Sequence, residues 1–321
     1  MQITNSEGYS YEPVRVVGHV PPYPADLVAK SKDLLTATCG LFKKLGPVAH
    51  VAPHVFAKYK VHADRARTSA AVIGVEPVDL LAANLCYDLL MGASAMGCST
   101  LALAGPDGPV LARNMDWFPA EKVAKASCLV TEEYGVNAGF LGMLGAVTGL
   151  SSHGFCVCLN AAFGGSDPDG YPMLLFLRHV LDTATNYRAA LEMITTERLM
   201  SGGIITVVGT RNEERAIVER APRRATVREA RGSEPLLATN HFRDLSTPEE
   251  CPRYAHMAAF VGQVRPLNLL TSKHVLQEIT AQHVVMCPAT QTAEMFVPSH
   301  LLPESVCEEM TLADLYRYFL N

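Results

Sequence analysis

A thiol, a guanidinium and a carboxylate lie within one short stretch of this chain. Cys98 belongs to the run Gly-Cys-Ser-Thr at 97–100, and the run Arg-Asn-Met-Asp-Trp follows at 113–117. The residues at 105–109 are the turn formers Gly-Pro-Asp-Gly-Pro, and apolar runs at 101–104 and 110–112 flank this cluster. Two aliphatic runs around such a cluster predict a β-hairpin.

A hairpin folded about Asp107 brings Cys98 and Asp116 together, because each lies nine residues from Asp107. Side chains directly opposite each other in an antiparallel pair are about 5 Å apart. Arg113 lies on the same strand as Asp116, but strict alternation puts these two side chains on opposite faces. Both line one site only where a bulge or a strand end intervenes. Taken singly, each residue also has an ordinary structural explanation, as a buried thiol or a surface ion pair.

Together the two runs resemble the nucleophile hairpin of the acid ceramidase, N-acylethanolamine acid amidase and choloylglycine hydrolase families. These are N-terminal-nucleophile hydrolases, in which the catalytic Cys becomes the first residue after the precursor cuts itself. A second segment, Ala-Thr-Asn-His-Phe at 238–242, has Arg253 thirteen residues after Asn240. It resembles the Thr-Asn-Tyr or Thr-Asn-His segment of the same families, whose Arg follows at a similar distance.

Further segments extend the resemblance from about Leu80 to Arg253. The run Asn-Leu-Cys-Tyr-Asp at 84–88 is similar to the segment that precedes the nucleophile in ceramidase-like chains, although it lies further from the Cys here. Gly97 before Cys98 and the pair Asn-His at 240–241 also resemble the penicillin acyltransferase branch.

The resemblance implies that processing creates the catalytic base. Scission between Gly97 and Cys98 frees an α-amino group with an ordinary pKa of about 8, near the pH at which a general base is most effective. A thiol with a resting pKa of about 8.5 needs such a base or a nearby cation to act as a nucleophile. Neither motif implies a His at the nucleophile, so we expect the uncut chain to be a zymogen.

The remaining motif residues take implied roles around the nucleophile. Asp116 would hold the α-amine in position, and Arg113 would favour the thiolate and the polar end of the substrate. Asn240 would donate its side-chain amide to the oxyanion, an interaction worth about 3–4 kcal/mol in comparable sites. Arg253 would be a buried partner for the carboxylate of the site, and its alternative is a solvated surface charge.

Two further residues are weaker candidates. Asn160 ends the strand-like run 154–159 and resembles a family Asn near the oxyanion hole, and its alternative is a turn residue at a strand end. Trp117 adjoins Asp116 and would line an acyl pocket or pack in the core. Ala161 stands where ceramidase-like chains have an acidic residue, and Tyr254 stands in place of a second Arg. These two departures leave the substrate open.

Composition narrows the function class. The chain has 321 residues, 49% of them hydrophobic and 18% charged, which is typical of an ordinary soluble protein. A net charge of −5 without a basic cluster argues against nucleic-acid binding. No apolar run reaches the roughly 18 residues of a membrane span. No cofactor is implied.

The cysteines and histidines indicate neither a metal site nor a secreted protein. The nine cysteines are odd in number and scattered, without paired metal-ligand spacing. His50 and His54 are four residues apart, but we expect Pro53 between them to break the helix that a zinc pair needs. Residues 1–7 lack the basic start and apolar core of a signal peptide, and no Asn-x-Ser/Thr sequon occurs. We therefore expect a cytoplasmic protein in a reducing compartment.

The predicted elements divide the chain at the scissile bond. Residues 1–97 form an N-terminal helical segment, with helices over about 25–44 and 78–91, and residues 98–321 form the catalytic domain. Small residues at 92–97 leave the backbone before the nucleophile free to adopt the tight geometry of an acyl shift. Downstream, two helices are predicted within 173–194, a hairpin from 204–208 and 216–218, and helical spacing at Val275–Ile279 and Leu312–Leu315. Helices interleaved with hairpins fit an α/β fold, and the resemblance implies a four-layer αββα sandwich.

We therefore predict a Cys amidohydrolase that cleaves the linear amide of an N-acylated small molecule or lipid through a thioester. The first alternative is an acyltransferase that passes the acyl group from the same thioester to an amine. The second alternative is a catalytically silent homologue that acts as a binding protein. The expected partner is the small-molecule substrate, and self-association into a homo-oligomer is left open.

Overall fold

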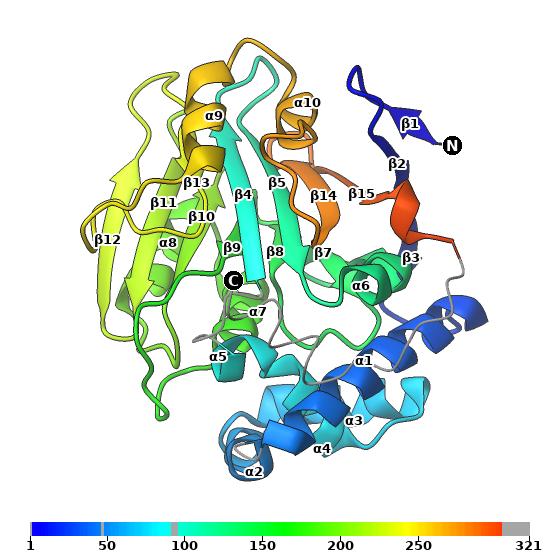
Figure 1. Cartoon of the computed structure of the whole chain (residues 1–321). Coiled ribbons are helices and arrows are strands. Elements are labelled where there is room, and N and C mark those ends of the chain that lie inside the picture. The colour runs from blue at the N-terminus through cyan, green and yellow to red at the C-terminus, as the bar shows by residue number, and fades with distance from the viewer. Residues whose placement is uncertain (1, 46–47, 91–95, 304–321) are drawn as a thin grey trace.

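Two stacked β-sheets form the centre of the computed structural model, which describes residues 2–45, 48–90 and 96–303 (Figure 1). The first sheet has seven strands in the order β1-β2-β15-β14-β5-β4-β13. Their bounds in that order are Ile3–Thr4, Ser10–Pro13, Thr292–Pro298, Thr280–Cys287, Val110–Trp117, Met96–Leu103 and Leu236–Ala238. The second sheet has eight strands in the order β12-β11-β10-β9-β8-β7-β6-β3. Their bounds are Arg224–Glu229, Arg215–Ala221, Gly203–Val208, Phe155–Asn160, Thr148–Ser151, Gly135–Phe140, Ser127–Glu132 and Arg15–Gly18.

Helices cover the outer face of each sheet. Helices α7 (Met173–Thr183) and α8 (Tyr187–Thr196) pack on the eight-stranded sheet, and α9 (Pro252–Phe260) and α10 (Pro266–Leu270) pack on the seven-stranded sheet. The layers are therefore helix, sheet, sheet and helix, and the predicted α/β sandwich is confirmed.

A further group of helices lies at one end of the sandwich (Figure 1). It comprises α1 (Ala25–Leu45), α2 (Val48–Lys58), α3 (Lys60–Ile73), α4 (Pro77–Asn84) and α5 (Cys86–Leu90). Helix α6 (Ala120–Ala126) packs between α1 and the strands β5 and β14, and the short 3-10 helix η1 (Ser299–Leu301) follows β15.

Alternating side chains of the β4–β5 hairpin enter two different cores. Ala102 and Leu111 pack between the two sheets, in a cluster with residues of β9, β10 and β14. Leu101 and Ala112 pack on the other side, against Met257 of α9 and the apolar residues of α10. Because successive side chains of a strand point to opposite faces, the position of Cys98 places its thiol between the sheets. We call this the inner face of the hairpin, and the side covered by α9 and α10 the outer face.

The register of this hairpin differs by one residue from the prediction. Gly97 lies opposite Asp116, and Cys98 lies opposite Met115. The turn is centred on the bond between Pro106 and Asp107, because the loop 104–109 between the last paired residues has an even number of residues. A shift of one residue moves a side chain to the other face. Asp116 is therefore on the outer face, whereas the thiol of Cys98 is on the inner face.

The N-terminal segment is not purely helical, which corrects the prediction for residues 1–97. Strand β2 pairs with β15 in one sheet, and β3 pairs in parallel with β6 in the other. Residues 10–18 combine Tyr and Val with an edge Pro, which suits extended backbone. A division of the chain at 97/98 stays a prediction.

Helix α2 also corrects a prediction, because it continues through Pro53. A Pro inside a helix removes one hydrogen bond and favours a kink or an end. Here Ala52 and Val55 on either side of Pro53 are almost completely buried, so packing of this helix outweighs the local cost. No group of three or more metal-ligating side chains occurs among the residues that the structure describes.

Most other predicted elements are observed. The patterns within 173–194 form α7 and α8, and the second predicted hairpin forms β10 and β11. Pro77 begins α4 as predicted, but the single helix predicted over about 78–91 is two helices, because α4 ends at Asn84 and α5 begins at Cys86. The helix predicted at 275–279 is wrong, because this segment forms turns and coil that connect α10 to β14. The small residues at 92–95 and the pattern at 312–315 lie outside the described residues.

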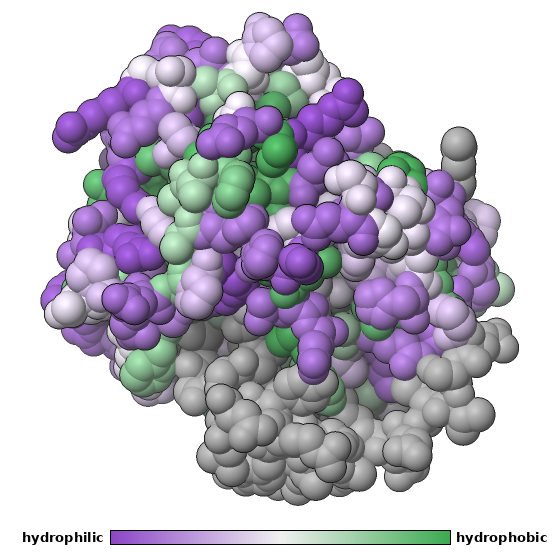
Figure 2. All heavy atoms as spheres, turned by 45° about the horizontal axis from the view of Figure 1, so that its top comes forward, coloured by the Kyte–Doolittle hydropathy of each residue, from purple (hydrophilic) through white to green (hydrophobic). Residues whose placement is uncertain are grey.

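The exterior is mixed in character. When the molecule is turned so that the top of Figure 1 comes forward, hydrophilic residues surround smaller hydrophobic areas (Figure 2). None of the helices in the described part of the chain has the length and apolar character needed to cross a membrane.

Candidate active site

The thiol of Cys98 lies in a closed environment between the two sheets. Its Sγ atom accepts a hydrogen bond from Nη2 of Arg113 at 2.5 Å and lies 3.6 Å from the carbonyl oxygen of Leu159. The Arg113 guanidinium is itself fully buried, and its Nη1 donates to Thr148 Oγ1 at 2.8 Å and to the Val147 carbonyl at 3.2 Å. These hydrogen bonds to Thr148, the first residue of β8, and to the preceding residue Val147 hold the guanidinium against the sulfur.

Opposing influences act on the pKa of the Cys98 thiol. Burial raises the pKa of Cys98 above its ordinary value, while the Arg113 guanidinium lowers it and the Asp116 carboxylate raises it. Burial is the largest of these influences, so the thiol of the uncut chain is protonated near neutral pH. The cation alone therefore does not generate the thiolate, and a base is needed.

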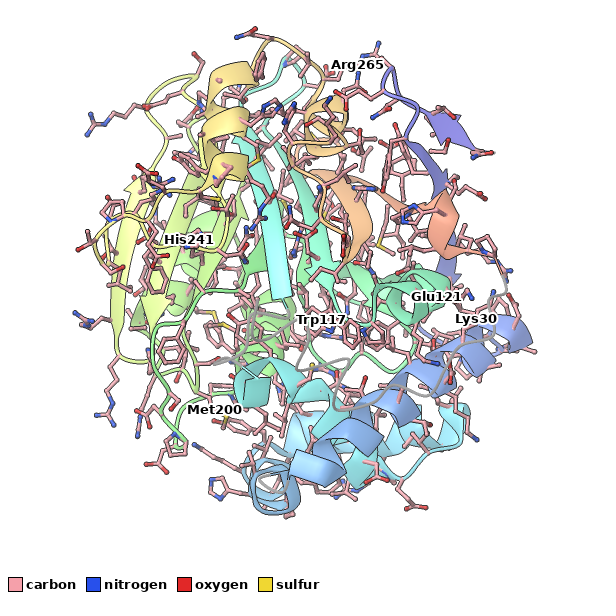
Figure 3. All side chains as sticks on the ribbon, viewed as in Figure 1. Lys30, Trp117, Glu121, Met200, His241 and Arg265 are labelled. Carbon is pink, nitrogen blue, oxygen red and sulfur yellow. The ribbon has the colours of Figure 1, made fainter. Side chains whose placement is uncertain are left out.

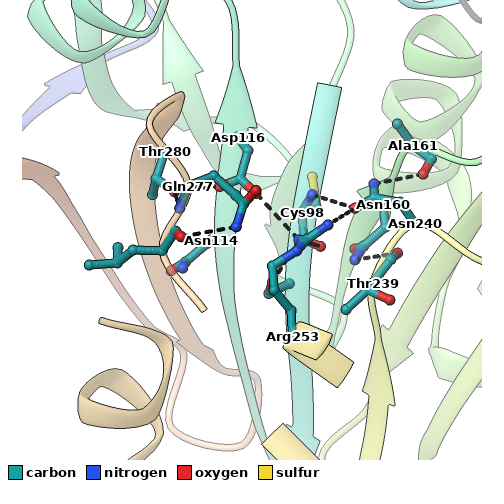
Figure 4. Close-up of polar contacts among 12 residues, drawn as sticks. Cys98, Asn114, Asp116, Asn160, Ala161, Thr239, Asn240, Arg253, Gln277 and Thr280 are labelled. Carbon is teal, nitrogen blue, oxygen red and sulfur yellow. Dashed lines mark hydrogen bonds and ion pairs between the residues drawn. The ribbon is translucent and has the colours of Figure 1, made fainter. Parts of the chain in front are cut away.

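The backbone of Cys98 is held from the outer face and from the strand edge (Figure 4). Its N–H donates to Asn240 Oδ1 at 3.1 Å, and its carbonyl oxygen accepts from Arg253 Nη1 at 2.9 Å. Arg253 Nη2 also donates to Asn240 Oδ1 at 2.9 Å. The nitrogen that would become an α-amine thus lies beside the side-chain amide that the sequence analysis assigned to the oxyanion.

Asn240 is oriented by a bond on its other side. Its Nδ2 donates to the carbonyl oxygen of Ala161 at 2.7 Å. A side-chain amide nitrogen carries two hydrogens, so the bond to Ala161 uses one and the other is available to a developing oxyanion. Asn240 directly follows Thr239 at the end of β13, the neighbour of β4 in the sheet, which explains how residues so distant in sequence meet.

Asp116 lies against the backbone immediately before the nucleophile. A Cβ atom at Gly97 would lie only 2.9 Å from Asp116 Oδ2, so a glycine at this position allows the carboxylate to approach the chain. Thr280 Oγ1 donates to Oδ1 at 2.7 Å, and Arg253 Nη1 forms an ion pair with Oδ2 at 3.5 Å. Among the described residues Oδ2 has no hydrogen-bond donor, which leaves it open to a group beside Cys98.

The pKa of Asp116 reflects its burial. Burial raises this pKa above its usual value, and Arg253, Thr280 and Arg113 lower it in turn. Arg253 is therefore a partner for the carboxylate of the site, with a side chain that is only 16% exposed, rather than a solvated surface charge.

Asn160 is buried, and its side chain ties strands together. Its Oδ1 accepts from Thr100 Oγ1 at 2.7 Å, and its Nδ2 donates to the carbonyl oxygens of Thr239 at 3.0 Å and Ala238 at 3.3 Å. The residue is thus more than a turn former, because it joins β9 to β4 and to the segment that precedes Asn240. Its role at the oxyanion stays a prediction.

Trp117 lies at the end of β5, between the sandwich and the helical group (Figure 3). It lines a mostly apolar pocket together with Met115, which faces Cys98 across the hairpin. Residues from both parts of the molecule complete the walls, among them Leu34, Leu35, Met143, Val147 and Leu174. Trp117 therefore lies where it can both line an acyl pocket and pack at the rim of the core, the two roles predicted for it.

The segment at 84–88 fastens the helical group to the sandwich. Asn84 Oδ1 accepts from the N–H of Leu144 at 2.7 Å, and Asn84 Nδ2 donates to the carbonyl of Gly142 at 3.0 Å. Asp88 accepts from the N–H of Met173, the first residue of α7, at 3.0 Å and from Ser201 Oγ at 2.5 Å. Burial raises the pKa of Asp88 to about 6. These bonds dock the chain that leads to the nucleophile.

The structure brings Cys98, Arg113, Asp116, Asn240 and Arg253 together, and it adds residues that the sequence did not single out. Thr280 holds Asp116 from β14, and Ser99 Oγ accepts from Arg253 Nη1 at 3.1 Å. Ser99 stands in the nucleophile motif itself and could have been included on that ground. Thr280 begins a strand far along the chain, and no local signal marks it.

Comparisons with known proteins show which sequences and folds the chain is similar to. The sequence profile of the acyl-coenzyme A:6-aminopenicillanic acid acyl-transferase family matches residues 103–261, a range that contains Arg113, Asp116, Asn160, Asn240 and Arg253. The fold is similar to that of a Caenorhabditis elegans N-acylethanolamine-hydrolyzing acid amidase ortholog, with a TM-score of 0.53 and 19% sequence identity. The similarity covers 60% of this chain and 93% of that chain. No curated protein sequence is significantly similar to the chain.

Proposed function

Because the chain belongs to the N-terminal-nucleophile group of cysteine hydrolases and acyltransferases, we propose that it is an amidohydrolase acting on an N-acylated small molecule or lipid. The observation that carries this proposal is the arrangement around Cys98. The sulfur accepts a hydrogen bond from the buried guanidinium of Arg113. The backbone nitrogen of the same residue lies beside Asn240 and Asp116. One residue then supplies both the nucleophile and, after scission, the base.

The proposed activation is self-cleavage between Gly97 and Cys98. The thiol adds to the Gly97 carbonyl, the peptide C–N bond breaks, and the freed nitrogen takes the thiol proton. Water then hydrolyses the resulting thioester, which leaves a carboxylate on Gly97 and a free thiol and α-amine on Cys98. Asp116 Oδ2 would accept a hydrogen bond from this amine, and the short distance between Oδ2 and Gly97 supports this role.

Catalysis on the substrate follows the same logic. The α-amine takes the thiol proton, and the thiolate, stabilised by Arg113, attacks the amide carbonyl. Asn240 Nδ2 donates to the oxyanion. The amine leaving group receives the proton from the α-ammonium, and water hydrolyses the acyl-thioester. The apolar pocket beside Met115 and Trp117 would receive the acyl chain.

The second candidate function is acyl transfer to an amine. The matched acyl-transferase profile favours it, since the same thioester is attacked by an amine in place of water. A fatty-acyl aminomethylcoumarin, incubated with the processed protein with and without a small primary amine, distinguishes the two activities. Free fatty acid alone supports hydrolysis, and N-acylated amine supports transfer. A processed protein that forms no acyl-thioester with this probe would support the silent binding protein.

Intact-mass measurement of the purified protein tests the activation step. We expect fragments 1–97 and 98–321, which stay associated under native conditions because β2 and β3 pair with strands of the other fragment. Cys98→Ala should remain one chain, whereas the matched variant Cys158→Ala, at another buried cysteine, should be cut. An uncut wild-type chain with full activity would remove the α-amine from the mechanism.

A further inference from the structure

A second buried carboxylate, Glu219 on β11, lies outside the nucleophile site and bonds to the segment that follows Asn240. Only 1% of Glu219 is exposed. Its Oε1 accepts from the N–H of Arg243 at 2.7 Å, and its Oε2 accepts from the N–H groups of Asp244 and Leu245 at 2.9 and 2.8 Å. Buried charge is costly unless hydrogen bonds satisfy it, and here three backbone donors do so.

The segment held by Glu219 has no helix or strand hydrogen bonds of its own. Residues 239–246 follow β13 as bends and coil, outside any helix or strand. Backbone N–H groups in such a segment need acceptors from elsewhere. Glu219 supplies them from the eight-stranded sheet, whereas β13 belongs to the seven-stranded sheet. The contact therefore spans the two sheets of the sandwich.

A second side chain contacts the chain on the other side of Asn240, in β13. Arg228 on β12 donates from Nη2 to the carbonyl oxygen of Leu237 at 3.4 Å. The same Nη2 lies 3.9 Å from Glu219 Oε1. The chain is thus held three residues before Asn240 by Arg228 and by the pairing of β13 with β4, and from three residues after it by Glu219. Asn240 lies between these two anchors.

We infer that Glu219 is a positioning residue that sets the place of the Asn240 side-chain amide against Cys98. The inference rests on the proposed function, in which Asn240 donates to the oxyanion. Preorganised donors lose their value when they are displaced, and a shift of about 1 Å can cost about 10²-fold in rate. A carboxylate that fixes three consecutive N–H groups limits such a shift.

The test compares Glu219→Gln with a matched control on the same hairpin. The Gln amide has one acceptor oxygen, and its NH2 group faces backbone donors, so the segment 243–245 should move. We expect kcat on a fatty-acyl aminomethylcoumarin to fall by about 10–10²-fold, with KM changed by less than about twofold. Glu214→Gln is the control, because Glu214 Oε2 also accepts from two backbone N–H groups, those of Thr210 and Arg211, in the β10–β11 turn. This control should keep the wild-type kcat.

A double-mutant cycle shows whether Glu219 acts through Asn240. If it does, Glu219→Gln combined with Asn240→Ala should be no slower than Asn240→Ala alone. Effects that multiply would overturn the inference, as would a Glu219→Gln protein that only melts at a lower temperature and keeps its kcat. Should Glu219→Gln fail to fold, Glu219→Asp keeps the charge but shortens the reach of the carboxylate to the three N–H groups. It should lower kcat in the same direction with KM unchanged, and an unchanged kcat there would equally overturn the inference.

A readout independent of turnover separates this inference from the proposed function. The side-chain amide resonance of Asn240, identified by its loss in Asn240→Ala, should shift in Glu219→Gln and not in Glu214→Gln. An unshifted resonance overturns the positioning role. A shifted resonance together with an Asn240→Ala protein of wild-type kcat supports positioning and instead overturns the oxyanion role of Asn240.

Discussion

The two faces of the β4–β5 hairpin surround the same cysteine but act on different parts of it. On the inner face, between the sheets, Arg113 donates a hydrogen bond to the Cys98 sulfur, and the Cys98 side chain is buried in the apolar core. On the outer face, Arg253 bonds to the Cys98 carbonyl, and Asp116 lies against the chain at Gly97. Asn240 completes the arrangement at the strand edge by accepting from the Cys98 nitrogen.

The difference follows from the geometry of a strand. A strand directs a side chain to one face only and keeps its backbone polar groups in the plane of the sheet. In the proposed mechanism, the thiol of Cys98 can therefore be tuned from the inner face, while the nitrogen that would become the base is positioned from the edge and the outer face. We infer that the inner face controls the thiolate and the outer face controls the amine, and four substitutions test this division.

Asp116→Asn should have the largest effect, because it removes the charge that would orient the amine on the outer face. We expect kcat/KM of the processed enzyme to fall by about 10⁴-fold, as when a triad loses its orienting carboxylate. An α-ammonium without a carboxylate neighbour loses its proton more readily, so the acidic limb of the pH–rate profile should move to lower pH. Asp107→Asn, in the exposed turn of the same hairpin, is the control. A wild-type rate and profile for Asp116→Asn would make this carboxylate structural only.

Asn240→Ala tests the strand edge between the two faces. Loss of one oxyanion donor should lower kcat by about 10²–10³-fold while processing and folding stay largely intact. Asn212→Ala provides the comparison, since Asn212 bonds to Gly105 at the turn end of the hairpin. If kcat of Asn240→Ala matches that of Asn212→Ala, Asn240 has no part in the chemistry.

Arg113→Met addresses the inner face alone. The guanidinium lowers the thiol pKa against the effect of burial, so its removal should raise that pKa. We expect the alkylation rate of Cys98 by iodoacetamide at neutral pH to fall by about 10-fold or more, with its pH profile moved upward. The acidic limb set by the amine should stay in place. Arg113→Lys keeps the charge and should recover part of the rate, whereas an unmoved alkylation profile in Arg113→Met would show that the inner face does not tune the thiol.

His283→Gln should have the smallest effect, and on stability rather than rate. His283 pairs with Asn114 on the outer face, with Tyr9, Tyr11 and His300 around it, and burial lowers its pKa to about 3. Between pH 6.5 and about 3 the unfolded chain binds a proton that the folded chain excludes, so stability falls as pH falls through this window, by up to about 1.4 kcal/mol per pH unit. Urea unfolding at pH 7 and pH 5 should give a smaller difference for His283→Gln than for the wild type.

The exposed His153 provides the control for that measurement, because His153→Gln should leave the pH dependence of unfolding unchanged. A slope for His283→Gln equal to that of the wild type would show that this histidine is not the group responsible. A large loss of kcat/KM in His283→Gln would extend the catalytic part of the outer face beyond Asp116.

The sequence by itself determined the elements whose signals are local. The turn cluster at 105–109 predicts the β4–β5 hairpin, Pro77 predicts the start of α4, and the apolar spacing within 173–194 predicts two helices. The nucleophile motif and the Thr-Asn motif identified the residues that meet at the site, because their types and order carry the family resemblance. Such signals depend only on neighbours in the chain.

Only the tertiary structure decided the register, the faces and the partners. Whether Cys98 faces Asp116 or Met115 depends on one residue in the length of a loop, and the turn residues alone do not specify it. Pro53 stays inside a helix because Ala52 and Val55 are buried, and β2 and β3 exist because strands from distant segments are available to pair with them. Thr280 and Glu219 acquire their roles from groups more than twenty residues away. Contacts of this kind depend on how the sheets stack, and a local pattern carries no record of that packing.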